Sequence, residues 1–347
     1  MRATETPEGG PAISVSVVIP TRGRPELVLK AVASALAQTF ERIEVIVVAD
    51  GEDPRTRRAL DGVRDPRLRV VDLAVSVGGA EARNIGVRAA RGEWIAFLDD
   101  DDEWLPHKLS RQIVAARRSR ALLPVISSRV IVRTAVGEFI RPLRPYDPKK
   151  PVSEFLFCRR SLDDGPYAMQ TSTLMMRREF MCALPFRAEL KRHQDWDWLL
   201  RAERVPGVEF AVIDEPLAIY RTEDGRESVG QSQDWKYSMQ WGREMQGFFS
   251  PKAYSWFLAS ECAPRAVKSR AGFRIFAEIA RQFLLDGRPS WGSAAMLAAF
   301  LALPQQSREA LRRFKRRTPR REGGPLPSLT AKDVQATAGM ELRSAGQ

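Results

Sequence analysis

In the stretch Glu93-Trp94-Ile95-Ala96-Phe97-Leu98-Asp99-Asp100-Asp101-Asp102-Glu103-Trp104, an apolar run leads directly into four consecutive aspartates. The apolar half is rich in aromatic and β-branched residues and is bounded by Gly92 and by charge, which is typical of a strand buried on both faces. The aspartates therefore follow the end of a buried strand. Adjacent carboxylates repel one another, so a fold keeps them together when a cation offsets their charge or water solvates them.

Two interpretations of this acidic cluster are open: a solvated loop end, or a site for a hard divalent cation. A helix-loop-helix calcium loop is excluded, because the chain has Trp104 where that loop needs Gly and Ser110 where it needs Glu. A phosphoaspartyl nucleophile is disfavoured, because Glu103 stands where Thr or Val is expected. A metal held at the strand end is the leading interpretation.

The composition is that of a globular protein, with 347 residues of which 44% are hydrophobic and 28% charged. The N-terminal segment Met1–Pro11 lacks the apolar core of a secretory signal, so we expect a cytoplasmic location. Cys158, Cys182 and Cys262 are few and have no metal-ligand spacing. We expect these cysteines to be buried packing residues.

The net charge of +12 is concentrated near the C-terminus, where Arg308–Arg321 holds eight basic residues against Glu309. The segment follows an apolar stretch, Ser293–Leu303, which is shorter than the roughly 20 residues that span a bilayer. Arg308–Arg321 could be a solvated helix face or a contact with an anionic membrane surface. We expect no nucleic-acid partner.

The first half of the chain alternates strands with helices, which predicts a parallel α/β sheet. The predicted strands are Ile13–Ile19, Glu44–Val48, Arg67–Asp72 and Trp94–Leu98, and the helices are one beginning at Pro25, then Thr56–Val63 and Gly78–Arg91. The turn after the first strand contains only Gly23, so the dinucleotide fingerprint is missing and NAD and FAD are not expected. Asp50 and the acidic cluster both fall at carboxyl ends of parallel strands, where such sheets bind ligands.

The second half is less regular. It predicts a helix at Leu105–Arg120, a strand at Pro124–Val132, a long loop at Val136–Pro151, a strand at Thr171–Met176, a helix at Asp195–Glu203 and two short strands at Gly207–Ile213 and Pro216–Arg221. Ser232–Pro304 is predicted to be helical and is rich in aromatic residues, which could form a packed core or a sugar-stacking surface.

Several motifs, taken in chain order, resemble those of the family 2 glycosyltransferases. They are Val17–Thr21, Gln38-Thr39, Glu44–Val48 with Asp50-Gly51, Gly79 with Ala82–Gly86, Gly92–Trp104, Gln194–Asp197 and Tyr220-Arg221. The resemblance covers about residues 14–225. It depends on the ordered set rather than on any one motif.

The resemblance implies an α/β GT-A fold, a mixed and mostly parallel sheet flanked by helices, with a C-terminal helical extension. The expected organisation is a disordered tail at residues 1–12, a GT-A domain at 13–230, a helical basic region at 231–321 and a disordered tail at 322–347. Within the GT-A domain, residues 13–132 would form the nucleotide-binding half and 133–230 the acceptor half.

The resemblance also implies an enzyme of the hexosyltransferase type that acts in polysaccharide biosynthesis. It would transfer a sugar with inversion from a nucleoside diphosphate sugar to a hydroxyl of a saccharide or lipid-linked acceptor, in the cytoplasm or peripherally at the inner face of the membrane. Its expected site residues are Pro20, Thr21 and Asp50 at the base and ribose, Asp99 at the ribose or metal water shell, Asp100 at the donor, Asp101 on Mg²⁺ or Mn²⁺ in a DXD motif, Arg83 on a phosphate or an aspartate of the metal site, and Asp195 as general base.

This chemistry suits the residue types. A divalent cation stabilises the negative charge of a departing diphosphate, and a carboxylate can take the proton of the attacking hydroxyl. Other interpretations stay open: Asp195 could cap a helix and Arg83 could form a surface salt bridge. A sugar nucleotidyltransferase, or a non-catalytic module that binds nucleotide sugars or membranes, remains an alternative for the whole chain.

Overall fold

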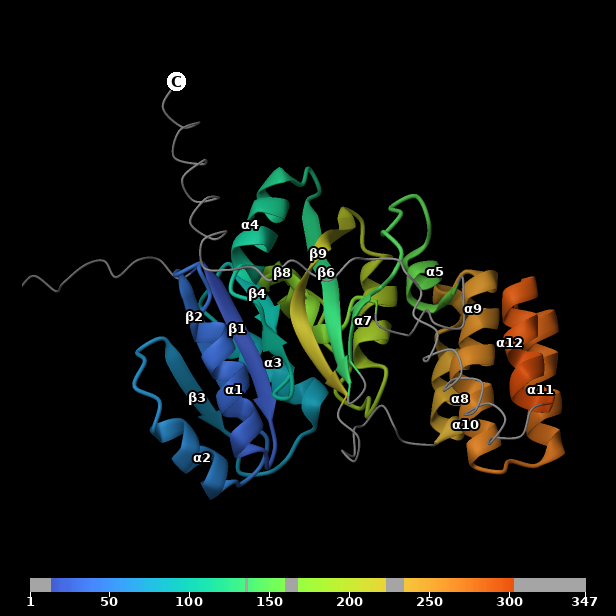
Figure 1. Cartoon of the computed structure of the whole chain (residues 1–347), viewed down its shortest axis with the longest axis horizontal. Coiled ribbons are helices and arrows are strands. Elements are labelled where there is room, and N and C mark those ends of the chain that lie inside the picture. The colour runs from blue at the N-terminus through green and yellow to red at the C-terminus, as the bar shows by residue number, and fades with distance from the viewer. Residues whose placement is uncertain (1–13, 135–136, 160–167, 223–233, 303–347) are drawn as a thin grey trace, which may run out of the picture. The chain divides into compact units, whose positions relative to one another are not determined.

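A computed structural model describes residues 14–134, 137–159, 168–222 and 234–302, and those up to Leu301 belong to one compact unit (Figure 1). Its described strands form one nine-stranded mixed sheet in the order β3-β2-β1-β4-β8-β6-β9-β5, with β7 paired to β6. The strands are β1 Val15–Thr21, β2 Ile43–Ala49, β3 Leu68–Asp72, β4 Trp94–Phe97, β5 Glu103–Trp104, β6 Leu123–Thr134, β7 Gly137–Arg141, β8 Met175–Arg177 and β9 Val208–Thr222. The predicted α/β class with a mixed sheet is confirmed.

The four strands β3, β2, β1 and β4 are parallel neighbours, as the alternating pattern predicts. Their side chains point alternately into two cores: Val17 and Ile19 face one, and Val18 between them faces the other. Both faces are covered, which explains why β1, β2 and β4 are buried, mostly apolar runs, whereas β3 at the end of this row is only half-buried. Because the strands run in parallel, the residues that follow β1, β2 and β4 meet at one edge of the sheet.

Helices cover the two faces of the sheet. The described helices are α1 Pro25–Leu36, α2 Pro54–Asp61, α3 Gly79–Ala89, α4 Lys108–Arg118, α5 Val152–Phe157, α6 Arg178–Ala183, α7 Gln194–Ala202, α8 Trp235–Glu244, α9 Pro251–Phe257, α10 Ala263–Lys268, α11 Phe273–Leu285 and α12 Trp291–Ala302. Buried residues of α1 and α4 share one core with the sheet, and those of α3 and α7 share the other. Thus α3 and α7 lie on the same side of the sheet.

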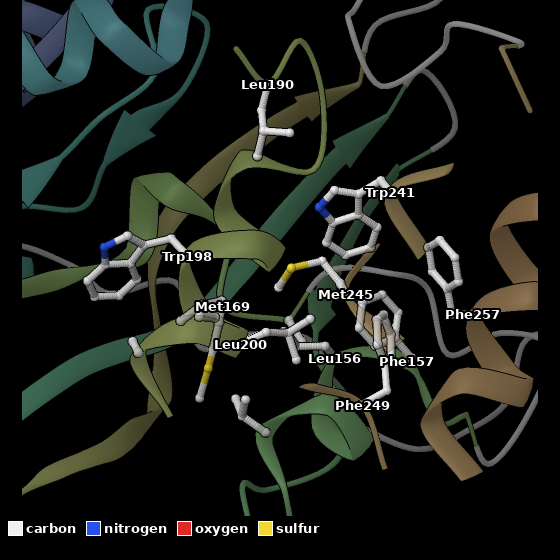
Figure 2. Packing of buried hydrophobic residues seen from close by; sticks show 14 of the residues in the cluster. Leu156, Phe157, Met169, Leu190, Trp198, Leu200, Trp241, Met245, Phe249 and Phe257 are labelled. Atoms are coloured by element: carbon white, nitrogen blue, oxygen red, sulfur yellow. The ribbon is translucent and has the colours of Figure 1, made fainter. Parts of the chain in front are cut away.

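The aromatic residues of the C-terminal helices form a packed core (Figure 2). Trp241, Phe249 and Phe257 are buried and lie within 5.8 Å of one another, centroid to centroid. Phe157 of α5 joins this cluster at 5.0 Å from Phe249 and 5.6 Å from Phe257. These side chains serve packing, so the interpretation as a sugar-stacking surface is not supported for them.

Several predicted elements differ in the structure. Gly207–Ile213 and Pro216–Arg221 form one strand, β9, because a shift in its register against β6 absorbs the residues between them. Thr171–Met176 begins as a 3-10 turn at Thr171–Thr173 and becomes a strand only at β8. Part of the predicted loop Val136–Pro151 is the strand β7, which pairs with β6 as a hairpin. The predictions also missed β5, α5 and α6.

The cysteine prediction is correct for two residues and wrong for one. Cys158 and Cys262 are buried, whereas Cys182 on α6 is exposed because it lies on the outer side of that short helix. No helix within the described ranges has the apolar length needed to cross a bilayer. The basic segment Arg308–Arg321 lies outside the described residues.

Candidate active site

The acidic cluster lies directly after β4, at the sheet edge that also carries the end of β1. The hydroxyl of Thr21, the last residue of β1, donates to Asp100 Oδ2 at 2.7 Å. Arg24, in the loop before α1, donates from Nη1 to Asp100 Oδ1 at 3.0 Å and to Asp101 Oδ2 at 3.3 Å. The loop after β1 therefore supplies a hydroxyl and a cation to the aspartates, and part of their mutual repulsion is offset by Arg24.

Asp102 is the buried member of this cluster that contacts the Thr171–Thr173 turn. Its Oδ2 accepts a hydrogen bond from the Ser172 hydroxyl at 2.5 Å, and the same hydroxyl accepts one from the Asp99 amide at 3.0 Å. Burial raises the pKa of Asp102 well above its usual value, and the charges of Asp99 and Asp101 add to this effect. The Thr171–Thr173 turn thus fixes the direction in which the chain leaves β4.

Arg83 connects the acidic cluster to the start of α7. From α3, its Nη2 pairs with Asp99 Oδ1, and its Nη1 donates to Gln194 Oε1 at 2.8 Å. Asp195 follows Gln194 directly, and the charges of Asp99 and Arg83 both act on its pKa, Asp99 raising it and Arg83 lowering it. The structure therefore brings Asp195 into the electrostatic range of the acidic cluster, although the two are about a hundred residues apart in the sequence.

The protonation of two carboxyl groups at this edge is shifted toward neutral pH. Burial raises the pKa of Asp195 to about 6, although a hydrogen bond from the Trp196 amide and the charge of Arg83 oppose the rise. Burial, together with the negative charges of Asp99 and Asp100, also raises the pKa of Asp101 to about 6. Carboxylates with pKa values in this range are suited to accept and release protons near neutral pH.

The acidic cluster provides the donor set that Mg²⁺ or Mn²⁺ prefers. The carboxylates of Asp99 and Asp101 are partly exposed, at 30% and 27% of their side chains. No group of three or more His, Cys, Asp or Glu side chains within the described part of the chain is arranged to hold a metal. One or two carboxylates suffice for Mg²⁺, which usually completes its shell with substrate phosphates and water. The residues present fit such a shared site.

Asp50 follows β2 and is engaged with the protein itself. Its carboxylate accepts hydrogen bonds from the Ser76 hydroxyl at 2.9 Å and from the Val77 and Gly78 amides at 2.6 and 3.0 Å. Gly78 has a φ of +87°, a conformation that favours glycine, and α3 begins directly after it. The contacts of Asp50 with the described residues therefore shape the loop that leads into α3. Pro20 is buried within β1, opposite Val48 of β2.

The helical extension holds the segment that carries Asp195. The Tyr237 hydroxyl accepts a hydrogen bond from the Lys191 amide at 3.0 Å. The Ser238 hydroxyl lies 2.9 Å from Arg192 Nη2 and 3.0 Å from His193 Nε2. His193 has a φ of +64° and is stacked on the Trp196 ring. Burial lowers the pKa of His193 well below its usual value, so its ring is neutral at physiological pH.

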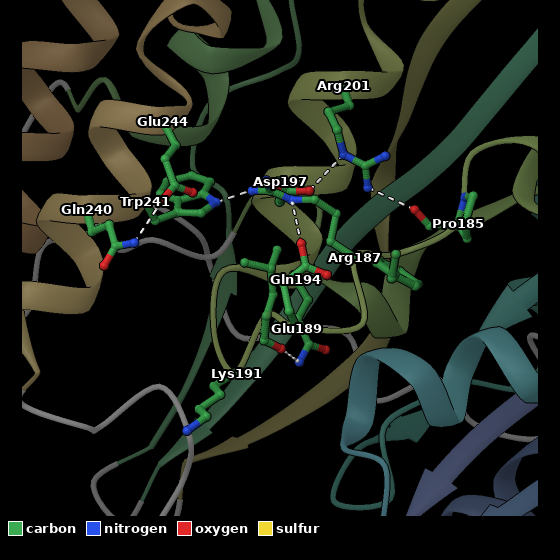
Figure 3. Close-up of polar contacts among 12 residues, drawn as sticks. Pro185, Arg187, Glu189, Lys191, Gln194, Asp197, Arg201, Gln240, Trp241 and Glu244 are labelled. Carbon is green, nitrogen blue, oxygen red and sulfur yellow. Dashed lines mark hydrogen bonds and ion pairs between the residues drawn. The ribbon is translucent and has the colours of Figure 1, made fainter.

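Asp197, two residues after Asp195, anchors α7 from within the core (Figure 3). Its fully buried carboxylate forms ion pairs with Arg187 and Arg201. The Trp241 indole of α8 donates to Asp197 Oδ1 at 3.2 Å. A single buried carboxylate therefore ties α7 to the loop before it and to the helical extension.

We expect Asp197→Ala to lower the free energy of unfolding by about 3 kcal/mol. Breaking a buried pair costs about 3–5 kcal/mol, and the partial exposure of Arg187 and Arg201 favours the lower end of this range. Urea denaturation followed by circular dichroism measures the loss. The control is Asp61→Ala, which removes an exposed ion pair with Arg57 and should cost less than about 1 kcal/mol. Equal losses for the two variants would contradict the anchoring role.

The sequence did not single out Arg24 or Ser172 as site residues. Arg24 could have been found, because a loop after β1 must lie beside the loop after β4 when the two strands are parallel neighbours. Ser172 had no such signal, since it reaches the aspartates through the antiparallel pairing of β8 with β4. The predicted residues Thr21, Arg83, Asp99, Asp100 and Asp101 do meet at one edge.

The chain is similar in sequence to a family of known proteins and to several of their members. The sequence pattern of Glycosyl transferase family 2 matches residues 16–181. The amylovoran biosynthesis glycosyltransferase AmsB of Erwinia amylovora is 32% identical over 66% of this chain and 76% of its own length. The Escherichia coli protein WfaP, a UDP-Glc:α-D-GlcNAc-diphosphoundecaprenol β-1,3-glucosyltransferase, is 35% identical over 28% of this chain and 39% of its own length.

A solved structure shares the fold. The crystal structure of S. aureus TarS matches with a TM-score of 0.51 and 17% identity, over 82% of this chain and 55% of that chain. The match extends the fold assignment beyond the residues that the family pattern covers.

Proposed function

Since the chain belongs to glycosyl transferase family 2 and is therefore a transferase, we propose that it moves a hexosyl group, with inversion, from a nucleoside diphosphate sugar to an acceptor hydroxyl. The observation that supports this proposal best is the bridge made by Arg83. This side chain pairs with Asp99 of the acidic cluster and with Gln194 beside Asp195. A donor-binding edge and a carboxylate of raised pKa thus belong to one connected site.

In the proposed reaction, Asp195 is the general base. The acceptor oxygen forms a bond to the anomeric carbon as the bond from that carbon to the diphosphate breaks, and the hydroxyl proton passes to Asp195. A carboxylate with a pKa of about 6 is ionised at neutral pH and can accept this proton. The hydrogen bond from the Trp196 amide to Asp195 Oδ1, at 2.9 Å, fixes the orientation of the carboxylate and leaves its other oxygen for the acceptor.

Asp101, with Asp99 beside it, is the proposed holder of Mg²⁺ or Mn²⁺. The cation would supply Lewis-acid stabilisation of the departing diphosphate. Thr21 and Arg24 hold Asp100 in place, and Arg83 holds Asp99, so that the cluster is oriented before the donor arrives. The guanidinium groups of Arg24 and Arg83 also offer donors for phosphate oxygens.

A saccharide or lipid-linked acceptor is proposed from the relatives. The name of WfaP describes a diphosphoundecaprenol-linked acceptor, and that of AmsB describes the biosynthesis of amylovoran. We therefore place this chain in polysaccharide biosynthesis, acting in the cytoplasm at the inner face of the membrane. An anionic surface there would suit the basic segment Arg308–Arg321.

We expect the rate of transfer to fall about tenfold for each pH unit below 6 and to be nearly constant between pH 7 and 8. The reason is that Asp195 acts only when ionised, and its pKa is about 6. The measurement is kcat/KM against pH. Asp101 has a similar pKa, but cation binding favours its ionised form, so an acid limb due to Asp101 would move to lower pH as Mn²⁺ is raised. An acid limb due to Asp195 would keep its position as Mn²⁺ is raised. A pH profile of kcat/KM that stays flat down to pH 5 would contradict the assignment of Asp195 as the base.

The direct test of the proposed function is a screen of nucleoside diphosphate sugars. One nucleotide class should raise the melting temperature in the presence of Mn²⁺, and the rise should disappear with EDTA. The stabilising donor should then release nucleoside diphosphate when a saccharide or lipid-linked acceptor is added. Release of pyrophosphate from a nucleoside triphosphate and a sugar phosphate would instead indicate the nucleotidyltransferase alternative.

A further inference from the structure

Arg24 contacts two carboxylates of the acidic cluster with one nitrogen atom. Its Nη1 donates to Asp100 Oδ1 at 3.0 Å and to Asp101 Oδ2 at 3.3 Å. The Asp100 side chain is 8% exposed, and its other oxygen accepts from the Thr21 hydroxyl at 2.7 Å. The Asp101 side chain is 27% exposed, and its contact with Arg24 is the longer of the two. The contact with Asp101 is therefore the one that can open while Arg24 stays on Asp100.

The backbone of Arg24 is fixed, whereas its guanidinium lies near the surface. The Arg24 carbonyl accepts from the amides of Leu27 and Val28 at 3.2 and 3.1 Å, which fixes Arg24 at the start of α1. The preceding Gly23 amide donates to Asp53 Oδ2 at 3.0 Å. The Arg24 side chain is 38% exposed. The guanidinium can therefore exchange one partner for another without a movement of the loop that carries it.

Arg24 and the divalent cation proposed above would use the same carboxylate. Asp101 is the proposed holder of the cation, and Arg24 already pairs with its Oδ2. A guanidinium beside a cation site repels the cation, and here it also engages an oxygen that the cation would bind. The geometry therefore sets the binding of Arg24 to Asp101 against the binding of the cation.

We infer that Arg24 competes with the divalent cation for Asp101 and, once displaced, pairs with the diphosphate of the donor. The inference rests on the proposed function and deepens it, because it makes the binding of the cation and the binding of the donor cooperative. With the cation alone, the displaced guanidinium gains no new anionic partner, so the cation should bind weakly. With a nucleoside diphosphate present, the N–H groups of Arg24 pair with phosphate oxygens, and each ligand strengthens the binding of the other.

The first measurement is the affinity of the full chain for Mn²⁺ without nucleotide, by electron paramagnetic resonance. Arg24→Gln should bind Mn²⁺ about tenfold more tightly than the wild type. A neighbouring guanidinium changes the affinity of a carboxylate for a proton by about 10- to 1000-fold, and the partial exposure of this pair favours the lower end. The matched control is Arg22→Gln, which removes the same charge from an exposed side chain of the same loop and should stay within about twofold of the wild type.

The second measurement is the affinity for UDP and for GDP at saturating Mn²⁺, by calorimetry. Arg24→Gln should bind the preferred nucleotide about tenfold more weakly than the wild type, because a charge-assisted contact with phosphate is lost. Arg22→Gln should again match the wild type. The same substitution thus moves the two affinities in opposite directions, whereas damage to the acidic cluster would weaken both.

Two results would overturn the inference and leave the proposed function standing. Equal Mn²⁺ affinities of Arg24→Gln and a wild type that transfers sugar would mean that Arg24 does not compete for Asp101. Weaker binding of both Mn²⁺ and nucleotide by Arg24→Gln would mean that Arg24 only orders the carboxylates. A wild type that binds no Mn²⁺, with or without nucleotide, would instead overturn the metal site of the proposed function and the inference with it. Should Arg24→Gln unfold, Arg24→Met, which keeps the apolar stem, decides in the same way.

Discussion

Asp195→Asn should lower turnover by about 10²–10⁴-fold while leaving donor binding intact, because a positioned base contributes a factor of this size. The amide is nearly isosteric with the carboxylate and can still accept the Trp196 N–H, so α7 should keep its geometry. It cannot accept the acceptor proton. Steady-state kinetics with a saturating donor measures the loss, and thermal stabilisation by the donor measures binding.

The control for this substitution is Glu203→Gln, a neutralised carboxylate at the other end of α7 that accepts from the Val152 amide and is remote from the acidic cluster. This variant should turn over at close to the wild-type rate. Near-normal turnover by Asp195→Asn, or a variant that no longer binds donor, would show that another carboxylate is the base.

Asp101→Asn should abolish metal-dependent transfer and weaken Mn²⁺ binding, because it removes the charge that would hold the cation. The fold should survive, since Arg24 keeps its stronger contact with Asp100 at 3.0 Å. Mn²⁺ affinity can be measured by electron paramagnetic resonance on the enzyme without donor and with nucleoside diphosphate, and this readout does not require turnover.

Asp61→Asn provides the exposed control for Asp101→Asn and should change neither Mn²⁺ affinity nor rate. Transfer that is insensitive to EDTA and to Asp101→Asn would contradict the metal assignment. Weakened Mn²⁺ binding with an unchanged rate would separate the cation from catalysis.

The parallel half of the fold could be predicted because its information is local. Strands β1, β2 and β4 are buried, mostly apolar runs that need cover on both faces, and polar residues follow the end of each strand at the sheet edge. The meeting of Thr21 with the aspartates follows from that parallel order alone. The antiparallel half depends on contacts between distant segments, so the joined strand β9 and its partner β5 could not be read from short windows.

The site was predictable in its residue types and less so in its contacts. A carboxylate at a strand end can face a ligand or turn back to the protein, and the sequence around Asp50 does not distinguish the two cases. Its three donors come from Ser76–Gly78, which are in reach only because β3 returns the chain to the same edge. The bridge from Arg83 to Gln194 likewise requires α3 and α7 to share one face of the sheet.

The hydrogen bond between Trp241 and Asp197 has a consequence for how such enzymes diverge and can be recombined. Helix α8 and the segment 187–201 are far apart in the sequence, yet they satisfy each other's buried polar groups. A substitution on one side is tolerated only if the other side compensates, so the two segments should coevolve. A chimera that receives α8 from a relative would therefore need residues 187–201 from the same parent.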